Sequence, residues 1–516
     1  MTKRTGSCLG TRRVFVQAAA FVLAVAATAS LAQDAPEDVY RYRIAYATYV
    51  GGSGDEQLRE VIPAADGSVL VGGQTSSPDL PVTPGAAQGE YGGEPAGRGH
   101  PGLYGGDCFL MRLSADGGKV LACTYFGGSK QERNVYGMAV DRKGDVVITS
   151  STRSRDLPTT PGSFQRKYGG GPSDWMVAKI SADLKRVLWC TYVGGDGDES
   201  PRGGLGLEAE DNVCVVGSSA SSNFPTTPGA YRRSRLGPRD AAVVKLKADG
   251  SGLAFSTLLG GSDTDGLMGV RVGADGRVHV AGHTRSADLP VTAGAPQPKL
   301  GGMSDAYFAG LSPDGAKLLY ATYLGGRGNE FAEHRPRLLD DGSVLLTGVT
   351  GSQDFPTTAG AAGRRFGGQT DGFLTKLAPG GKRWAFSTLL GGSAGEFFLM
   401  PTPDKRGNVF LVGTTRSPDF PVTAGALQAK YAGARGKWDG DGVLAVVTAD
   451  GSKRLYATFL GGRGADLIRS VALASDGAVY LVGSTSSADF PVTEGAASPK
   501  RRGRSDAFVV KLVPAG

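Results

Sequence analysis

The sequence predicts an all-β protein that folds as a seven-bladed β-propeller with four-stranded blades, its ring closed by the N-terminal strand completing the last blade. Three observations predict this fold. Two short motifs each recur seven times along the 516 residues, strand-like segments with alternating apolar residues lie between them, and the repeats show no helical periodicity. Four antiparallel strands in each of seven repeats is the arrangement of a closed propeller.

The first motif is a Gly-Gly pair that follows an aromatic or aliphatic run, and its copies are 65 to 76 residues apart. They begin at Gly51, Gly127, Gly194, Gly260, Gly325, Gly391 and Gly461. The second motif, Asp/Asn-Phe/Leu-Pro-Val/Thr-Thr, begins at Asp79, Asp156, Asn223, Asp288, Asp354, Asp419 and Asp489. Because two independent motifs give the same count, the sequence predicts seven copies of one structural unit.

The strands of a repeat are clearest in the last copy. Three are predicted there, at Ile468 to Ala474, Ala478 to Gly483 and Asp506 to Leu512. The repeats open with an orphan strand of the fourth type, Tyr42 to Val50. Each end lacks the strand type that the other end supplies. Pairing the two ends completes the seventh blade and removes two exposed strand edges.

These recurring segments, of which YATYLGG, DFPVTEGA and DAFVVKL are examples, resemble the repeats of the bacterial seven-bladed beta-propeller family often called SBBP. The resemblance covers nearly all of the chain from Tyr42 to Val513. It implies a propeller in an extracellular setting. It transfers no catalytic residue, because the family has few assigned activities and a fold alone does not supply a function.

Residues 1–32 are expected to form an export signal, with a basic start, an Ala-rich apolar core and a small-residue cleavage site. Arg12 and Arg13 are typical of a twin-arginine signal, and an ordinary secretory signal is the alternative. Residues 33–41 then form a short lead and residues 42–513 the propeller. The protein is expected to be exported, and to be periplasmic, at the cell surface or secreted.

The charge of the chain gives little support to nucleic-acid binding. Removing the four basic residues of the signal from the 56 Lys plus Arg leaves 52 against 49 Asp plus Glu, a formal net charge of +3. No stripe of basic residues interleaved with aromatics is present. We therefore expect no nucleic-acid partner, and no transmembrane segment in the mature chain, because the apolar run of the signal is shorter than the about 20 residues that a spanning helix needs.

Four cysteines remain after the signal: Cys108, Cys123, Cys190 and Cys214. Cys108 and Cys123 fall on neighbouring predicted strands, so a disulfide between them is one interpretation in an oxidising compartment. Small residues occupy the equivalent positions of most other copies. This pattern favours the other interpretation, that the cysteines are small buried side chains.

An acidic residue follows every Gly-Gly motif, and its side chain is predicted to lie near the mouth of a central channel. The series is Glu56, Glu132, Glu199, Asp265, Glu330, Glu396 and Asp466. A ring of carboxylates is a candidate site for Ca²⁺ or another hard divalent cation. The alternative is a loop brace repeated in each blade. The exchange of Glu with Asp, which differ in reach, favours a role for charge.

A second acidic series opens every predicted third strand, and we interpret it as a brace at the entry of the strand. Its members are Asp107, Asp174, Asp240, Asp305, Asp371, Asp441 and Asp506.

Departures from the repeat are the better candidates for ligand binding. Arg59, Arg202 and Arg469 occupy matching positions shortly after the acidic series, and the fifth copy carries Glu333, His334 and Arg335 there instead. Charged residues in variable loops can form a surface for a carbohydrate, a cell-envelope component or a protein. Drift in tolerant loops is the alternative.

The sequence contains no nucleophile elbow, phosphate loop or Cys/His metal spacing. It therefore predicts an exported binding or cell-surface scaffold propeller without catalysis. The alternative is an extracytoplasmic carbohydrate-active hydrolase or lyase that acts at the acidic channel mouth.

Overall fold

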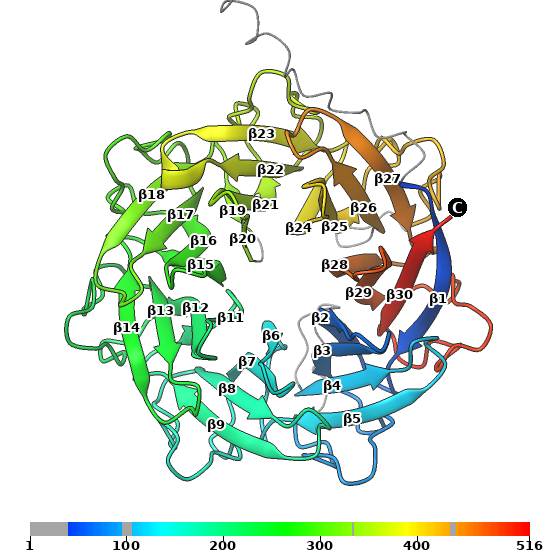
Figure 1. Cartoon of the computed structure of the whole chain (residues 1–516), viewed down its shortest axis with the longest axis horizontal. Helices are drawn as coiled ribbons and strands as arrows, with labels where there is room; N and C mark the ends of the chain where they lie inside the picture. Colours follow the sequence, from blue (N-terminus) through cyan, green and yellow to red (C-terminus); the bar gives the residue numbers. More distant parts are fainter. Residues whose placement is uncertain (1–39, 95–105, 333–334, 434–439, 516) are drawn as a thin grey trace, which may run out of the picture. The chain divides into compact units, whose positions relative to one another are not determined.

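The computed structural model of the chain describes residues 40–94, 106–332, 335–433 and 440–515. The chain divides into a unit Met1–Val39 and a unit Tyr40–Gly516, and only the second contains described residues. The predicted export signal and nearly all of the predicted lead therefore lie outside the described residues. Within the second unit, seven antiparallel sheets surround a central axis, which confirms the predicted seven-bladed propeller (Figure 1).

Each blade runs from a strand at the axis to a strand at the rim. The innermost strands are β2 (Glu56–Pro63), β6 (Gly137–Val140), β10 (Glu199–Ser200) with β11 (Leu205–Leu207), β15 (Asp265–Val272), β19 (Glu330–Ala332) with β20 (Arg337–Leu338), β24 (Glu396–Pro403) and β28 (Asp466–Leu473). The second strands are β3 (Val69–Thr75), β7 (Val146–Thr152), β12 (Val213–Ser219), β16 (Val278–Thr284), β21 (Val344–Thr350), β25 (Val409–Thr415) and β29 (Val479–Thr485).

The third strands each begin at an aspartate. They are β4 (Asp107–Leu113), β8 (Asp174–Ile180), β13 (Asp240–Leu246), β17 (Asp305–Leu311), β22 (Asp371–Leu377), β26 (Asp441–Val447) and β30 (Asp506–Pro514). The outermost strands are β5 (Val120–Phe126), β9 (Val187–Val193), β14 (Leu253–Leu259), β18 (Leu318–Leu324), β23 (Trp384–Leu390), β27 (Arg454–Leu460) and β1 (Tyr42–Val50). A 3-10 turn, η2 (Pro379–Gly381), lies between β22 and β23. No helix among the described residues is long and apolar enough to cross a membrane.

The two ends of the propeller meet in one sheet, as predicted. Strand β1 pairs antiparallel with β30, from Tyr42 opposite Pro514 to Val50 opposite Ala507. The seventh blade therefore has the order β1-β30-β29-β28. Closure by the N-terminal strand leaves neither chain end with an unpaired edge inside the ring.

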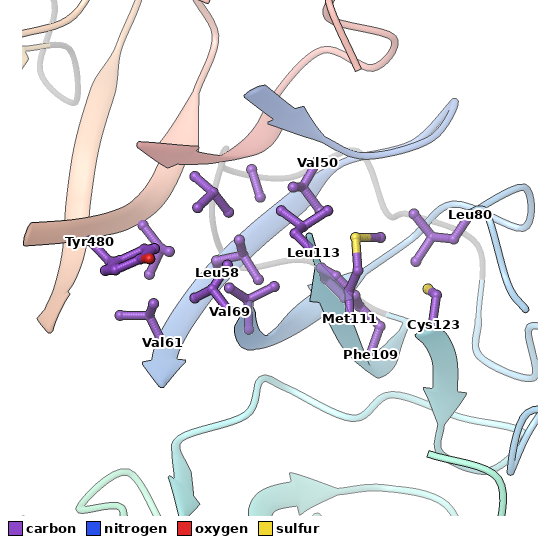
Figure 2. Packing of buried hydrophobic residues seen from close by; sticks show 14 of the residues in the cluster. Val50, Leu58, Val61, Val69, Leu80, Phe109, Met111, Leu113, Cys123 and Tyr480 are labelled. Atoms are coloured by element: carbon purple, nitrogen blue, oxygen red, sulfur yellow. The ribbon is translucent and has the colours of Figure 1, made fainter. Parts of the chain in front are cut away.

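The apolar core lies between neighbouring blades, because both faces of each sheet are covered. Figure 2 shows the cluster between the seventh and first blades, where Leu58, Phe109 and Met111 pack in one group with Tyr480. Alternate residues of a strand point to opposite faces of the sheet. Leu110 accordingly belongs to the next cluster along the ring.

The disulfide interpretation for Cys108 and Cys123 is wrong. All four described cysteines are buried and free. Cys108 lies opposite Phe126 and Cys123 opposite Met111, and the two thiols belong to core clusters on opposite faces of the sheet. The interpretation of the cysteines as small buried side chains is confirmed.

The innermost strands are less uniform than the other three. Strands β2, β15 and β28 each contain a register shift, which lies between Leu58 and Glu60 in β2. A β-bulge of this kind leaves one residue unpaired and re-aims its side chain. In the third and fifth blades the innermost strand is split in two, around Pro201 and Pro336. Proline has no N–H for the ladder, so the pairing stops there.

Candidate functional site

The acidic residue that follows each Gly-Gly motif is buried in every blade. Each is at most 2% exposed: Glu56, Glu132, Glu199, Asp265, Glu330, Glu396 and Asp466. We call these seven residues the brace carboxylates. A buried carboxylate needs hydrogen-bond donors to offset the loss of water, so its partners define its role.

The donors come from the same loop and from the end of the second strand. In the second blade, Thr152 Oγ1 donates to Glu132 Oε1 over 2.7 Å, and the N–H of Gly128 donates to Oε2 over 3.0 Å. Asp265 accepts equivalent bonds from Gly261 N–H at 2.7 Å and Ser286 Oγ at 2.9 Å. Glu and Asp therefore serve the same partners, and the exchange between them does not require a role for charge alone.

A second carboxylate approaches each brace carboxylate from the preceding blade. Asp107, the first residue of β4, faces Glu132, and a Cβ placed on Gly127 would collide with both carboxylates. The Glu132 N–H also donates to the carbonyl of Gly106 over 2.8 Å, so the contact joins two blades. The first glycine of the motif is thus required by the close approach of two acidic side chains.

The two repeated motifs also meet each other. The N–H of Ser53, just after a Gly-Gly pair, donates to Asp79 Oδ1 of the Asp-Leu-Pro motif over 2.7 Å. In the third blade Asp196 N–H donates to Asn223 Oδ1 over 2.8 Å. An amide oxygen accepts this bond as a carboxylate does, which explains why asparagine replaces aspartate there.

Burial raises the pKa values of these paired acids. Burial raises the pKa of Glu132 to about 8, against opposing hydrogen bonds from Ser154, Thr152 and Gly128. It raises the pKa of Glu56 to about 7 and that of Asp107 to about 6. In the third blade, burial and the neighbouring Glu199 raise the pKa of Asp174 to about 7. Each pair therefore holds a proton more tightly than either acid would in water.

The structure does not bring the seven brace carboxylates together around the axis. The described part of the chain contains no group of three or more His, Cys, Asp or Glu side chains that could hold a metal ion. The physical reason is that Ser and Thr hydroxyls at the end of each second strand donate hydrogen bonds to the carboxylate of the same blade. These bonds hold each carboxylate at the contact between its own blade and the preceding blade. Each carboxylate therefore has the geometry of the loop brace, and Ca²⁺ binding at these residues stays a prediction.

The predicted ligand-binding arginines lie on the innermost strands. Arg59 is the bulged residue of β2 and is 5% exposed, with its guanidinium carbon 4.9 Å from the centroid of the Tyr136 ring. Arg469 is partly buried at the bulge of β28. Arg202 is exposed and lies close enough to His283 to contribute to lowering its pKa, after burial, to about 4. Glu333 and His334 lie outside the described residues.

An ion pair crosses the propeller next to these arginines. Arg335, between β19 and β20 of the fifth blade, forms an ion pair with Glu60 of β2, and their side chains are 8% and 4% exposed. Nη1 of Arg335 also donates to the carbonyl of Met138 on β6 over 3.4 Å. The fifth blade is adjacent in the ring to neither the first nor the second (Figure 1), so this ion pair joins blades that are not neighbours.

Two further arginines join this ion pair. Arg271 of β15 is partly buried, and burial together with Arg337 and Arg335 lowers its pKa well below its ordinary value. Burial and Arg335 likewise lower the pKa of Arg337 to about 10. We call the group of Arg59, Arg271, Arg335 and Arg337 around Glu60 the axial arginine cluster.

Sequence reasoning named Arg59, and Arg335 after Glu333 and His334, among the departures from the repeat, but it missed Arg271, Arg337 and Glu60. Arg271, Arg337 and Glu60 each occur at positions that carry no charge of the same kind in most other copies. A signal was nevertheless present. Pro336 interrupts a strand-like segment of the fifth copy, and a proline within a predicted innermost strand marks a departure from the repeat.

A shallow groove of about 350 Å³ lies between the third and fourth blades, on the face opposite the brace carboxylates. Its lining includes Glu208, Lys245, Phe255 and Pro313. Lys245 Nζ is 2.6 Å from Glu208 and 5.1 Å from the centroid of the Phe255 ring. Lys245 and Glu208 thus already have partners within the groove.

Comparisons with known proteins found only distant structural likenesses. No model of a known protein family matches the chain, and no curated protein matches it. A protein of unknown function from Dyadobacter fermentans is 13% identical, with a TM-score of 0.40 over 74% of this chain and 97% of that one. BamB from Moraxella catarrhalis is 8% identical, with a TM-score of 0.39 over 92% and 100%. The polysaccharide lyase Uly1 is 9% identical, with a TM-score of 0.41 over 92% and 98%.

Proposed function

We propose that this protein is an exported, non-catalytic propeller that acts as a binding or cell-surface scaffold. The observation that carries the proposal is the contrast between two sets of buried charges. The brace carboxylates recur in every blade and are consumed by contacts that hold blades together. The axial arginine cluster occurs once and is directed at the axis, where a ligand can contact several blades at the same time.

The ligand class that we propose is a carbohydrate or another component of the cell envelope. The predicted export signal at residues 1–32 and the resemblance of the repeats to the SBBP family both support an extracytoplasmic setting. Placement in the SBBP family is itself part of this proposal. Arginine side chains offer several N–H donors in a fixed plane, which suits the oxygen-rich surface of a glycan.

A carbohydrate-active hydrolase or lyase remains the alternative. Glycoside hydrolysis needs two carboxyl groups that reach the sugar from opposite sides of the bond. The brace carboxylates are buried within the seams between blades, which favours binding over catalysis.

The two functions are separated by incubating the protein without residues 1–32 with a panel of neutral and acidic polysaccharides. The proposal expects retention on at least one polysaccharide, with no new reducing ends and no unsaturated product. Heat-unfolded protein is the control for non-specific retention. Release of product that scales with enzyme concentration would establish the alternative, and failure to bind any member of the panel would overturn the carbohydrate proposal.

A further inference from the structure

We propose that the axial arginine cluster is a binding site for an oxyanion, a carboxylate, sulfate or phosphate group that a ligand carries to the axis of the propeller. This inference rests on the proposed binding function and names the chemistry of its ligand. It follows from the balance of charge, from unpartnered buried atoms and from the geometry of the guanidinium groups.

The charges in the cluster do not balance. Among the described residues, the guanidiniums of Arg335 and Arg271 share one carboxylate, that of Glu60, and Arg337 adds a third positive charge beside Arg335. Burial raises the pKa of Glu60, and the positive charges of Arg335, Arg271 and Arg59 act against this rise. Like charges in a site of low dielectric repel strongly, and an added anion relieves this repulsion.

Hydrogen-bonding capacity is also left over. Within the described structure, Nε of Arg335, Nε of Arg271 and Oε1 of Glu60 are buried and have no hydrogen-bond partner. Arg335 as a whole is more than nine-tenths buried. A buried donor without an acceptor costs free energy, and an oxyanion that enters the cluster would supply acceptors for both donors.

The arrangement suits an oxyanion in particular. A guanidinium is a planar fork that donates two parallel N–H bonds to the oxygens of a carboxylate or phosphate. Arg271 and Arg337 are only partly buried, so an anion from solvent can reach them, whereas Arg335 and Glu60 close the inner side of the cluster. The ligand anion then competes with Glu60 for the guanidiniums. Glu60 is a positioning residue that holds Arg335 in place across the axis.

The test is a thermal titration of the protein without residues 1–32 in sodium phosphate, sodium sulfate and sodium glucuronate, with sodium chloride at matched ionic strength. We expect a saturable rise in Tm with the oxyanions beyond that in chloride, because a ligand that binds only the folded state stabilises it. A response to glucuronate at lower concentration than to phosphate identifies a sugar acid as the ligand. The reverse order identifies a free inorganic anion.

Two variants and a matched control assign the response to the cluster. Arg271→Gln is expected to weaken the apparent affinity about tenfold, the loss expected of one charge-assisted hydrogen bond. Glu60→Gln removes the internal competitor and is expected to strengthen it. Arg277→Gln changes an exposed arginine just beyond β15, whose side chain is 58% exposed and paired with Asp275, and should leave the response unchanged.

The inference is overturned if the oxyanions act no differently from chloride on both the wild type and Glu60→Gln, or if Arg271→Gln and Arg277→Gln respond alike. If Glu60→Gln does not fold, the comparison of Arg271→Gln with Arg277→Gln decides. Polysaccharide binding that survives Arg271→Gln unchanged would leave the proposed function standing and remove the oxyanion site. An oxyanion response without polysaccharide binding would support the oxyanion site and overturn the proposed carbohydrate binding.

Discussion

The brace carboxylates and the axial arginine cluster are both buried charged groups on or beside the innermost strands, yet they differ in two respects. The carboxylates recur in all seven blades, and each accepts hydrogen bonds from its own loop and from the second strand. The cluster draws its arginines from the first, fourth and fifth blades, and the buried Nε donors of Arg271 and Arg335 have no partner among the described residues. Recurrence here goes with contacts between neighbouring blades, and departure from the repeat goes with a contact across the axis.

The difference shows where to look for function in a repeat protein. A charged residue that recurs in every copy has a role that every copy shares, which here is contact with the neighbouring blade. Glu132 and Asp107 do this across one seam, and Gly127 makes room for both. A charged residue present in one copy has no such shared role. The free-energy cost of burying it must therefore be offset by an interaction specific to its position.

The largest effect is expected from opening the ring, on which both features depend. Deleting residues 42–50 removes β1, the outermost strand of the seventh blade, and exposes the edge of β30. We expect loss of the folded monomer, because the exposed edge pairs with other chains. Size-exclusion chromatography with a thermal scan measures this. A truncated protein that stays monomeric with an unchanged Tm would contradict the closed ring.

A large effect is also expected from pH, through the brace carboxylates. The pKa values of Glu132 and Glu56 are raised to about 8 and about 7, while the unfolded chain titrates near 4.5. Below that value both states are protonated and stability is full. As pH rises, the unfolded state ionises first, so the free energy of unfolding falls until the folded acids ionise too. The slope is about 1.4 kcal/mol per pH unit for each extra proton held by the folded state.

Urea unfolding between pH 5 and pH 8 measures this dependence. The measured free energy of unfolding should decrease steadily over the range, and Glu132→Gln should flatten part of the slope because glutamine does not titrate. Stability that is constant or increases with pH over this range would show that the brace carboxylates are charged in the folded state.

A smaller effect is expected from removing one brace carboxylate. Glu132→Ala leaves the hydroxyl of Thr152 and the N–H of Gly128 without their acceptor, at an expected loss of about 1–3 kcal/mol. Glu132→Gln keeps an acceptor and should lose less at pH 7. Glu90→Ala removes an exposed acid close to the same seam and serves as the control. Equal stability of all three variants would contradict the brace.

The smallest effect on stability is expected in the axial arginine cluster. Arg335→Met removes the partner of Glu60 but also relieves repulsion with Arg271 and Arg337. These two effects oppose each other, so the net loss should be about 1 kcal/mol or less, below the several kcal/mol usual for a broken buried ion pair. Chemical unfolding of Arg335→Met, with Arg277→Gln as the control, measures this loss of stability. A loss as large as that of Glu132→Ala would show that the cluster holds the blades together.

The sequence predicts the repeated parts of this molecule well. The bounds of β1 are the predicted ones, Tyr42–Val50, because the Gly-Gly motif and its aromatic run mark the strand in every copy. Strand β28 begins at Asp466 rather than at the predicted Ile468, since the brace carboxylate is itself the first paired residue. The burial of this series was missed, because its partners at the ends of the second strands are distant in sequence.

The axial arginine cluster was only partly predictable for a different physical reason. Arg335 meets Glu60 across the axis, between blades that are far apart in sequence and not adjacent in the ring. Repeat alignment compares equivalent positions and carries no information on contacts between different positions of distant copies. Arg59 could be chosen because it shares its position with Arg202 and Arg469, and Arg335 because it follows Glu333 and His334 where the fifth copy departs from the repeat.

The central claim is that the recurring carboxylates hold the blades while the single arginine cluster receives the ligand. Parallel thermal titrations with sodium glucuronate and with calcium chloride, each against sodium chloride, test it most directly. The account predicts that glucuronate raises Tm in the wild type and much less in Arg271→Gln, and that calcium changes neither. A calcium-dependent rise in Tm that Glu330→Gln and Glu396→Gln abolish, with no response to glucuronate, would contradict it and establish the carboxylates as the ligand site.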